Sequence, residues 1–383
     1  MDATFDGDIV RAGVEGRERF YDSRGYGRPV DDGIELAPVE AAHLLFRGDL
    51  AGVTDRRSDS PTAGEQLDFH DILASAAVSE VAFFVYKELR DRGFYLSPAR
   101  DGWIDAAVVN VSDGVDAAVA DSATGGGSDD GTTVPVDFVV YPRGNGPWDG
   151  EIAYHVRVVS ERASVGADLL LALARIDEGT GVLAVVDEES EVTYLETVAP
   201  TISGSTHHDL DAVEGELLSD RVLVWDPPSA LHDRAFYGQR LDRDDEPVQL
   251  SLVEAAYLAR LGVLELAETD DDTATLVERG RAVEGERFDR RLRAYSALRT
   301  AGVVPKTGFK FGADFRTYAD VDSVEHLGHS ELLVRVLPSD HRFDPRDLAL
   351  DVRLAHGVRK RMIVALTDVD EGIDWLAVER LTP

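Results

Sequence analysis

Apolar residues recur with helical spacing at two places in the chain, each marked by the letters VEAA. In the second of these stretches, Val253, Ala256, Tyr257 and Leu261 fall on one face of a helix. Short strand patterns such as RVLVWD precede it. This combination predicts a small subdomain of strands and helices.

A longer helix is predicted in the segment FDPRDLALDVRLAHGV. Asp344 suits the N-cap, Pro345 suits the first helical turn, and Gly357 stands where a helix would just have ended. The segment before this helix, SELLVRVLP, has the nearly continuous apolar pattern of a strand. Two more strands are predicted after the helix, in RKRMIVALTD and IDWLAVERL, with the acidic turn DVDEG between them. GFKFGADFRTYAD, with Gly308 and Gly312, indicates a turn and a strand.

The chain also repeats itself, because three motifs occur twice in the same order. The pairs are FYDSRGYGRPV…VEAA from Phe20 with FYGQR…VEAA from Phe236, VYKELRDRGF from Val85 with AYSALRTAGV from Ala294, and VVDEESEVTYLE from Val185 with LTDVDEGIDWLAVE from Leu366. We interpret the chain as a tandem duplication of the α/β (α+β) class.

Each copy divides into a small α/β subdomain and a larger α/β domain. The predicted boundaries are 1–78 and 79–200 for the first copy, and 218–285 and 286–383 for the second. The polar stretch GGGSDDGTT, from Gly125, is expected to be an exposed loop inserted into the first copy.

Charge adds a second feature. The chain has 73 acidic and 39 basic residues, a formal net charge of −34, and only four of the basic residues are lysines, at 87, 306, 310 and 360. The carboxylates are spread among the periodic segments, which favours a surface adapted to high salt over an acidic tail. In molar salt the Debye length is about 3 Å, so a negative surface need not repel an anionic partner at a distance.

Some site classes and locations can be set aside. With no cysteine, disulfides, thiolate zinc sites and thiol nucleophiles are excluded. The start MDATFDGDIV lacks the features of a signal peptide, and no apolar run approaches the ~18 residues of a membrane span. We therefore expect a cytoplasmic protein without membrane contact.

Three blocks, KTGFKFGADFRTYAD, GHSELLVRVLP and HGVRKRMIVAL, resemble the catalytic domain of archaeal tRNA-intron endonucleases. The duplicated layout extends the likeness over nearly the whole chain, and it is similar to the two-repeat, homodimeric class. The resemblance implies a nuclease-like domain in each copy, with the second one catalytic. It also implies a homodimer that cuts precursor tRNA at bulge–helix–bulge sites, leaving 2′,3′-cyclic phosphate and 5′-hydroxyl ends.

Carried over by motif, the catalytic tyrosine of that family falls on Tyr318, its histidine on His329 and its lysine on Lys360. Two arginines that clamp a flipped bulge base in the family fall on Arg353 and Arg380. The resemblance also implies that an acidic loop of the first copy enters a basic pocket of the opposite subunit. Here that loop would be Asp187, Glu188, Glu189 and Glu191.

These residue types suit cleavage by a neighbouring 2′-oxygen. An imidazole titrates near pH 6.5 and can protonate the leaving oxygen, and an ammonium can offset charge on phosphorus. A phenol titrates near pH 10, so a tyrosine base would need a positive charge close by. The base and acid roles of Tyr318 and His329 therefore stay open. No metal or small-molecule cofactor is required by this scheme.

The duplication offers an internal test of these assignments. Through the shared VRV, His329 corresponds to Glu151, and through the pairs DWL and TYL, Lys360 corresponds to Gly179. The stretch opposite FRTY is taken to be SPARDGW, which lacks tyrosine. All three candidates are then missing from the first copy, which indicates a non-catalytic partner domain.

Three alternatives remain. The chain could be a catalytically silent RNA-binding or assembly subunit of the same fold. It could be a restriction-enzyme-like nuclease, which would need clustered carboxylates and Mg²⁺. It could also be an acidic metabolic enzyme of a halophile, although no GxGxxG after a strand and no GxxxxGK[ST] is present.

Overall fold

The computed structural model describes residues 2–100, 103, 108–109, 132–242, 247–267, 269, 271–367 and 372–383. The predicted GGGSDDGTT loop lies outside this part except for its last two residues, Thr132 and Thr133, and so does most of the acidic turn DVDEG. Within the described ranges, no helix is both long enough and apolar enough to span a bilayer.

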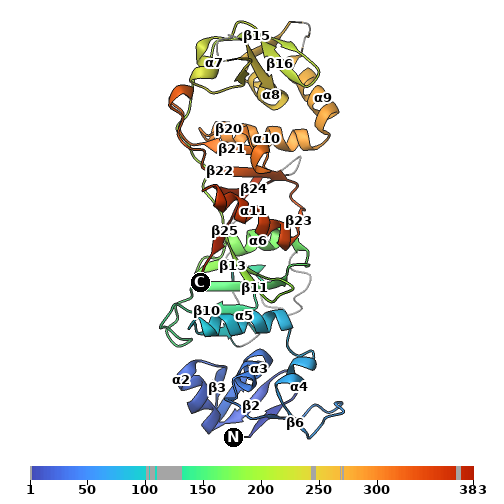
Figure 1. Ribbon diagram of the computed structural model, residues 1–383, viewed down its shortest axis with the longest axis vertical. Coiled ribbons are helices and arrows are strands. Elements are labelled where there is room, and N and C mark those ends of the chain that lie inside the picture. The colour runs from blue at the N-terminus through green and yellow to red at the C-terminus, as the bar shows by residue number, and fades with distance from the viewer. Residues whose placement is uncertain are drawn as a thin grey trace. The chain divides into compact units, whose positions relative to one another are not determined.

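The chain forms two compact units of mixed α/β structure, shown in Figure 1. Unit 1 comprises Met1–Val198 with Arg342–Ala349 and Arg380–Pro383, and unit 2 comprises Ala199–His341 with Leu350–Glu379. Each unit repeats the same plan, a small strand–helix subdomain followed by a sheet with helices. The duplicated α/β architecture predicted from the sequence is thereby confirmed.

Unit 1 begins with strands in the order β3-β4-β2-β1-β5-β6 and continues with strands in the order β7-β10-β11-β13-β14. The first group is β1 (Ala3–Phe5), β2 (Val10–Gly13), β3 (Arg28–Val30), β4 (Gly33–Leu36), β5 (Val53–Asp55) and β6 (Gln66–Leu67). The second group is β7 (Leu96–Pro98), β10 (Phe138–Val140), β11 (Tyr154–Ser160), β13 (Thr180–Val186) and β14 (Val192–Val198).

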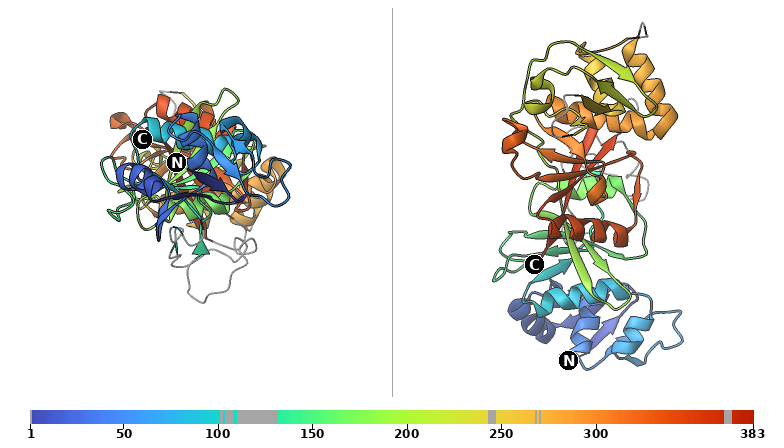
Figure 2. Two further views of the ribbon diagram at one scale, coloured as in Figure 1. Left: turned by 90° about the horizontal axis from the view of Figure 1, so that it is seen from below. Right: turned by 45° about the horizontal axis from the view of Figure 1, so that its top comes forward.

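The longer helices of unit 1 are α3 (Pro38–Phe46), α5 (Glu80–Asp91) and α6 (Ala167–Ala174). Helix α5 contacts both α3 and β11, and Figure 2 shows it between the two groups of strands. Its residues Phe83, Val85, Tyr86 and Leu89 are buried at helical spacing, so one apolar stripe joins the subdomain to the following sheet.

Unit 2 follows the same order. Its first strands run β17-β18-β16-β15-β19, and the later ones run β20-β21-β22-β24-β25. The first group is β15 (Val213–Leu217), β16 (Arg221–Val224), β17 (Gln239–Arg240), β18 (Val248–Ser251) and β19 (Leu264–Leu266). The second group is β20 (Val304–Thr307), β21 (Phe315–Tyr318), β22 (Leu332–Leu337), β24 (Arg361–Thr367) and β25 (Ile373–Leu381).

The longer helices of unit 2 are α8 (Leu252–Arg260), α9 (Asp272–Glu284), α10 (Arg287–Thr300) and α11, which spans Pro345–Gly357 and begins in residues grouped with unit 1. Asp344 accepts the backbone N–H of Arg346 at 2.9 Å, as expected of an N-cap residue. Gly357, predicted just past the end, is the last helical residue.

The VEAA motif has a structural reason in both copies, because its glutamate closes the first turn of a helix. Glu40 accepts the backbone N–H of Ala37 at 2.8 Å in α3, and Glu254 accepts that of Ser251 at 3.0 Å in α8. Each bond satisfies a backbone donor before the helix, and the second forms a full capping box because Ser251 Oγ also accepts the N–H of Glu254 at 3.3 Å. The second oxygen of each carboxylate accepts a glycine N–H, from Gly27 or from Gly238.

Because Gly27 and Gly238 donate to equivalent glutamates, they occupy equivalent positions in the two copies. This equivalence corrects one detail of the predicted repeat. The letters FY at Phe20 and at Phe236 were paired from the sequence, whereas the structure makes Tyr26 and Tyr237 equivalent. Arg90 stands 3.8 Å from the ring centre of Tyr26, and Arg299 stands 3.8 Å from that of Tyr237. The FY match was a coincidence of letters five residues out of register, but the VEAA and Val85/Ala294 matches hold.

Candidate active site

The three predicted catalytic residues lie at strand ends in unit 2. Tyr318 is the last residue of β21, His329 lies three residues before β22, and Lys360 immediately precedes β24. Strand β21 runs antiparallel to β22, and β22 runs parallel to β24. The end of β21 and the beginnings of β22 and β24 therefore meet at the same edge of the sheet.

Backbone hydrogen bonds hold these strand ends together. The N–H of Glu331 donates to the carbonyl of Thr317 at 3.0 Å, and the N–H of Arg361 donates to the carbonyl of Glu331 at 3.1 Å. Each of these three residues is one or two positions from a candidate. The main chain thus fixes the spacing from which the three side chains project.

Lys360 is positioned by the residue that follows His329. Its Nζ donates to the Oγ of Ser330 at 2.5 Å and also to the carbonyl oxygen of Ser330. The ammonium stands 5.6 Å from the ring centre of Phe311. Partial burial lowers the pKa of Lys360, and the positive charge of Arg316 lowers it further. The lysine is directed by neutral oxygens and, in the described part of the chain, has no carboxylate partner.

The ring of Tyr318 is largely buried. It packs against Phe236, with ring centres 5.7 Å apart, and against Val304 and Val321. The guanidinium carbon of Arg316 lies 5.9 Å from the centre of the Tyr318 ring. Because these two residues alternate along β21, both project from the same face of the sheet. Arg316 is thus a cation on the same face of the sheet as Tyr318.

His329 is exposed, and its imidazole makes no hydrogen bond or ion pair with any residue that the structure describes. Lys360 contacts its neighbour Ser330 instead of the imidazole. The three residues thus lie at the same edge of the sheet. Lys360 is hydrogen-bonded to Ser330, next to His329, but the side chains of Lys360 and His329 make no hydrogen bond with each other.

The two predicted base-clamp residues are also exposed. Arg353 lies on α11, and Arg380 lies near the end of β25 in the segment grouped with unit 1. Neither forms an ion pair with a described carboxylate. Both guanidinium groups are therefore accessible to a ligand.

The predicted acidic loop is a tight turn between β13 and β14. The side chain of Asp187 accepts the backbone N–H groups of Glu189 and Glu191, each at 2.9 Å, and Ser190 adopts a positive φ of 65°. Glu188 pairs with Arg162. One acidic residue therefore shapes the turn, while the carboxylates of Glu189 and Glu191 remain exposed.

The strand registers compare the two copies directly. Leu332 pairs with Arg361 as Tyr154 pairs with Thr180, which makes Lys360 the counterpart of Gly179. Counting back along the same strands, His329 corresponds to Glu151. These two predicted correspondences are confirmed, and the first copy lacks both the histidine and the lysine.

The prediction for the tyrosine was wrong. Phe315 pairs with Val334 as Phe138 pairs with Val156, so FRTY corresponds to FVVY and Tyr318 to Tyr141. SPARDGW precedes the long insertion of the first copy, whereas the true counterpart FVVY follows it. The repeated DF before each strand was the signal that could have found it.

Tyr141 is buried and donates a hydrogen bond to the Oγ of Ser97 at 3.0 Å. Burial raises the pKa of Tyr141, and the bond to Ser97 opposes that rise. The position of Arg316, in contrast, is occupied by Val139 in the first copy. A tyrosine at this place is therefore part of the shared framework, whereas the positive charges around it belong to the second copy alone.

Lys306, left open from the sequence as phosphate-facing or surface, is buried. Its Nζ donates to Glu254 Oε1 at 2.8 Å and to the carbonyl of Gly238 at 2.8 Å. Burial alone would raise the pKa of Glu254, but the charge and hydrogen bond of Lys306 outweigh burial and lower that pKa to about 2. The counterpart of Lys306 is Ser97, and burial without a lysine raises the pKa of Glu40 to about 7.

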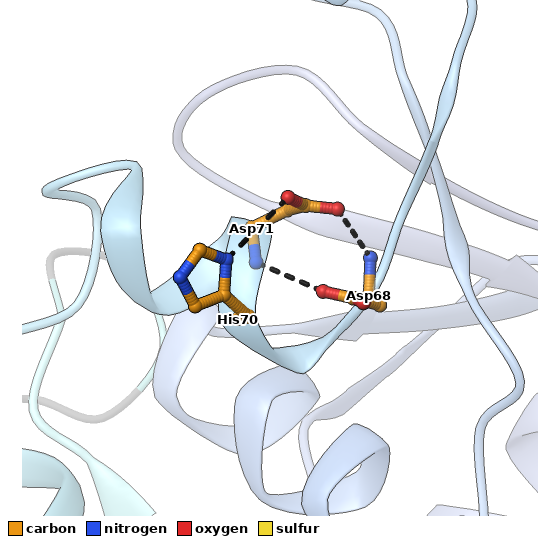
Figure 3. A group of neighbouring side chains, drawn as sticks. All are labelled: Asp68, His70 and Asp71. Atoms are coloured by element: carbon orange, nitrogen blue, oxygen red, sulfur yellow. Dashed lines mark hydrogen bonds and ion pairs between the residues drawn. The ribbon is translucent and has the colours of Figure 1, made fainter.

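One group of possible metal ligands occurs in the described residues, Asp68, His70 and Asp71, and Figure 3 shows it. All three side chains are exposed. Asp68 accepts the N–H of Asp71 at 3.0 Å, and Asp71 accepts that of Asp68 at 3.1 Å. The carboxylates are used as a capping box at the start of the six-residue helix α4 (Phe69–Ala74).

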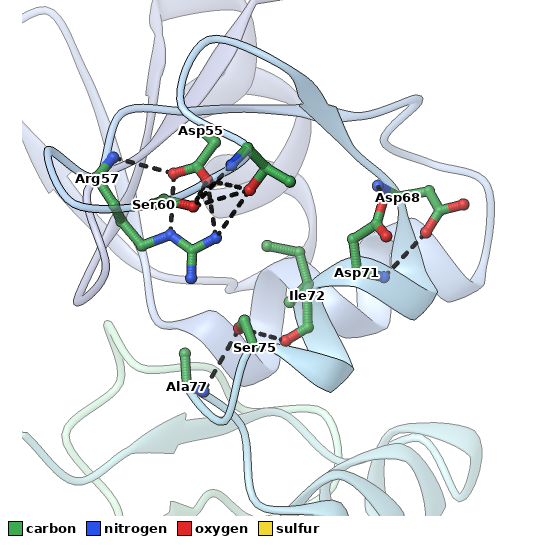
Figure 4. A network of polar contacts seen from close by, with 9 residues as sticks. Asp55, Arg57, Ser60, Asp68, Asp71, Ile72, Ser75 and Ala77 are labelled. Carbon is green, nitrogen blue, oxygen red and sulfur yellow. Dashed lines mark hydrogen bonds and ion pairs between the residues drawn. The ribbon is translucent and has the colours of Figure 1, made fainter.

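A second polar network lies nearby and is also structural (Figure 4). The buried carboxylate of Asp55 accepts hydrogen bonds from Arg57 at 2.8 and 2.9 Å, from Ser60 at 2.6 Å and from Thr62 at 2.7 Å. The hydrogen bond from Arg57 contributes most to a strongly lowered pKa of Asp55. Every oxygen of this carboxylate is occupied by the turn that follows β5.

Comparison with known families identifies the small subdomain of both copies and the larger domain of the second copy. The sequence model of the tRNA intron endonuclease catalytic C-terminal domain matches residues 288–375. The model of the tRNA intron endonuclease N-terminal domain matches twice, at residues 1–62 and 213–278. The double match agrees with the duplication seen in the structure.

Individual relatives resemble the whole chain. A tRNA-splicing endonuclease of Haloarcula marismortui is 58% identical over 385 residues, and one of Natronomonas pharaonis is 54% identical over 384 residues, each covering 100% of both chains. A tRNA-splicing endonuclease of Methanococcoides burtonii is 36% identical over 94% of both chains.

Proposed function

The chain belongs to the tRNA intron endonuclease family and is an endoribonuclease of tRNA splicing, and from this premise we propose how it cuts. The substrate is an intron-bearing precursor tRNA folded as a bulge–helix–bulge. The neighbouring 2′-hydroxyl attacks the scissile phosphorus, and the products carry a 2′,3′-cyclic phosphate and a 5′-hydroxyl. The position of Lys360 beside Ser330, at the sheet edge where Tyr318 and His329 also lie, carries this proposal.

The reaction needs three groups from the protein. A base takes the proton of the 2′-hydroxyl, an acid protonates the departing 5′-oxygen, and a cation offsets the charge that develops on the nonbridging oxygens. No outside water enters, because the nucleophile is part of the RNA. No step of this scheme requires a metal ion or another cofactor.

The surroundings of each residue favour particular roles. Lys360 suits the cation, since its ammonium is directed by two oxygens of Ser330 and has no described carboxylate to neutralise it. His329 suits the acid because it is exposed to an incoming ligand. Tyr318 suits the base because it lies at the same strand ends as the other two residues, with Arg316 on the same face of the sheet.

The comparison between copies supports the proposal for two of these residues. Glu151 and Gly179 stand where His329 and Lys360 stand, although the strands around them share the same register. Residues kept only for the fold would be expected in both copies. The same argument does not apply to Tyr318, because the first copy has a tyrosine, Tyr141, at the equivalent position. The proposed role of Tyr318 rests on its place beside Arg316 and on the family resemblance.

RNA binding and assembly complete the proposal. Arg353 and Arg380 hold an unpaired base by stacking their guanidinium planes on it. The protein acts as a homodimer, which provides two active sites for a substrate with two scissile bonds.

The acidic loop at Asp187–Glu191 enters a cavity in unit 2 of the opposite subunit. A cavity of about 440 Å³ in unit 2 is lined by Arg316, Lys306, Arg221 and Arg291 among others. Lys306 pairs with Glu254, Arg221 with Asp220, and Arg291 with Glu284. Arg316 has no carboxylate partner among the described residues and a buried Nε without an acceptor. Its free charge suits a carboxylate from the exposed tip of the loop.

The first test is a cleavage assay. The purified protein is incubated with an intron-bearing precursor in high salt with EDTA, and the end groups of the products are analysed. Excision with cyclic phosphate and 5′-hydroxyl ends supports the proposal. Strict dependence on Mg²⁺ would favour the restriction-enzyme-like alternative, and RNA binding without any cleavage would favour the silent assembly subunit.

A further inference from the structure

We infer that Phe309 is a stacking platform for an unpaired nucleotide beside the scissile phosphate. The inference deepens the proposed function and rests on it. It concerns the turn between β20 and β21, which the three catalytic candidates do not use. Its elements are the exposure of one aromatic ring, the rigidity of its turn, and the contact of that turn with Lys360.

The exposure of Phe309 is unusual for this chain. Its side chain is 86% exposed, and the next most exposed large apolar residue of the described part, Leu261, is 56% exposed. The other exposed aromatic residues of the described part, Trp225, Trp148 and Phe46, are 53%, 50% and 49% exposed, so Phe309 offers the most accessible ring. Base–aromatic stacking is a general means of holding unpaired RNA.

The turn that carries the ring is firmly built. The N–H of Phe311 donates to the carbonyl of Gly308 at 2.8 Å, and that of Gly312 donates to the carbonyl of Phe309 at 3.2 Å. Gly312 has a φ of +69°, and a Cβ on Gly308 would lie only 2.8 Å from the carbonyl oxygen of Ala313. The backbone therefore holds Phe309 outward before any ligand arrives, which reduces the entropy lost on binding.

The same turn reaches the candidate active site. Phe311 packs in a cluster with Leu333, Ala355 and Met362, and the ammonium of Lys360 lies over its ring. Phe309 is two residues away on the outer side of the turn. Between them, Lys310 is exposed and is one of only four lysines in the chain. An exposed ring followed by a cation suits a nucleotide, whose base stacks while its phosphate meets the ammonium.

The corresponding position in the described part of the first copy carries no aromatic ring. The N–H of Gly308 donates to the carbonyl of Asp314 at 3.1 Å, and that of Ala99 donates to the carbonyl of Asp137 at 2.9 Å, so the two positions correspond. Arg100 then stands in the place of Phe309. The exposed ring thus occurs in the copy that has His329 and Lys360, as expected if it serves the RNA that they cut.

The test uses the full-length protein and a bulge–helix–bulge RNA with 2-aminopurine at one bulge position, taken in turn. We expect F309A to weaken RNA binding roughly tenfold and to abolish the change in 2-aminopurine fluorescence at one bulge position. F309W should retain both, and F309L should fall between. The melting temperature of F309A should match that of wild type, because the ring is exposed. The matched control is L261A, which removes another exposed apolar side chain of unit 2 and should bind as wild type.

Wild-type binding and fluorescence in F309A would overturn the inference while cleavage by the wild type keeps the proposed function intact. A wild type that never cuts the RNA would instead overturn the proposed function. If F309A weakens self-association in sedimentation and binds RNA normally at saturating protein, Phe309 is a protein contact and the inference is wrong.

Discussion

Lys360 donates through its Nζ to the Oγ of Ser330 at 2.5 Å, and Ser330 is the residue immediately after His329. One short side chain thereby links the segment that carries the proposed acid to the proposed phosphate-binding cation. The bond crosses between the beginnings of two parallel strands, so it fixes a spacing that neither strand sets alone. The same positioning role is absent in the first copy, where Ile152 corresponds to Ser330.

Replacing Ser330 with alanine tests this link. The carbonyl of Ser330 still accepts one hydrogen bond from Lys360, so we expect a partial loss. Single-turnover cleavage in S330A should fall roughly tenfold, in line with one lost hydrogen bond to a charged group, while RNA affinity stays unchanged. The control S323A removes a serine hydroxyl that bonds His326 at 3.1 Å, away from Lys360. Equal rates in S330A and S323A would contradict a positioning role.

Replacing His329 with alanine tests the proposed acid. The cleavage rate should drop by about a hundredfold or more, with RNA binding largely retained because an exposed side chain is removed. H326A is the matched control, since His326 is an exposed histidine on the same connection between β21 and β22. Cleavage by H329A at the rate of H326A would show that the mechanism is wrong.

The two equivalent tyrosines make a paired prediction. Y318F should reduce the single-turnover rate by about a hundredfold with little change in melting temperature. Y141F loses the buried bond to Ser97 and should lose about 1 kcal/mol of stability with normal cleavage. The comparison requires both variants, measured by cleavage and by denaturant unfolding. If Y141F slows cleavage as much as Y318F, the first copy is not the inactive one.

The Glu254–Lys306 pair predicts a pH-dependent stability. The folded pKa of Glu254 is lowered to about 2, so its contribution to stability is present above its unfolded pKa of 4.5 and is lost as pH falls through about 2. In K306M the buried carboxylate has no lysine and is strongly destabilising when charged, by about 3 kcal/mol or more. Denaturant unfolding at constant high salt should therefore show a larger loss for K306M at pH 8 than at pH 5.

An equal loss for K306M at both pH values would contradict this account. Glu40 provides an internal contrast, because its pKa is raised to about 7. The stability that it contributes is present below pH 4.5 and is lost as pH rises through about 7. A lysine at the corresponding position, in S97K, should lower the folded pKa of Glu40 and so reduce or remove this loss of stability as pH rises.

Much of the fold could be predicted from the sequence because local signals were strong. The continuous apolar run of SELLVRVLP and the Asp344 cap located β22 and α11 within a residue or two. Equivalences that depend on tertiary contacts were harder. The FY letters predicted a wrong equivalence, because the true one is defined by the glycine N–H that donates to Glu40 or to Glu254. The counterpart of FRTY was also predicted wrongly, because it is defined by strand pairing.

In the candidate site, too, the residues could be predicted from sequence motifs, whereas the contacts between them could not. Tyr318, His329 and Lys360 could be assigned by motif, but the positioning of Lys360 by Ser330 needed coordinates. The buried state of Lys306 was equally hidden, since its carboxylate partner is 52 residues away in the sequence. Arg316 could have been noticed by alternation along FRTY, which places it on the face of Tyr318.

The central claim is that the RNA's own 2′-hydroxyl is the nucleophile, served by side chains of the second copy. The most direct measurement compares cleavage of two precursors that differ only by a 2′-deoxy substitution at the nucleotide preceding one scissile phosphate. We predict that the substituted site resists cutting, while the other site still yields cyclic phosphate and 5′-hydroxyl ends. Cleavage of the deoxy site at the normal rate would contradict the account.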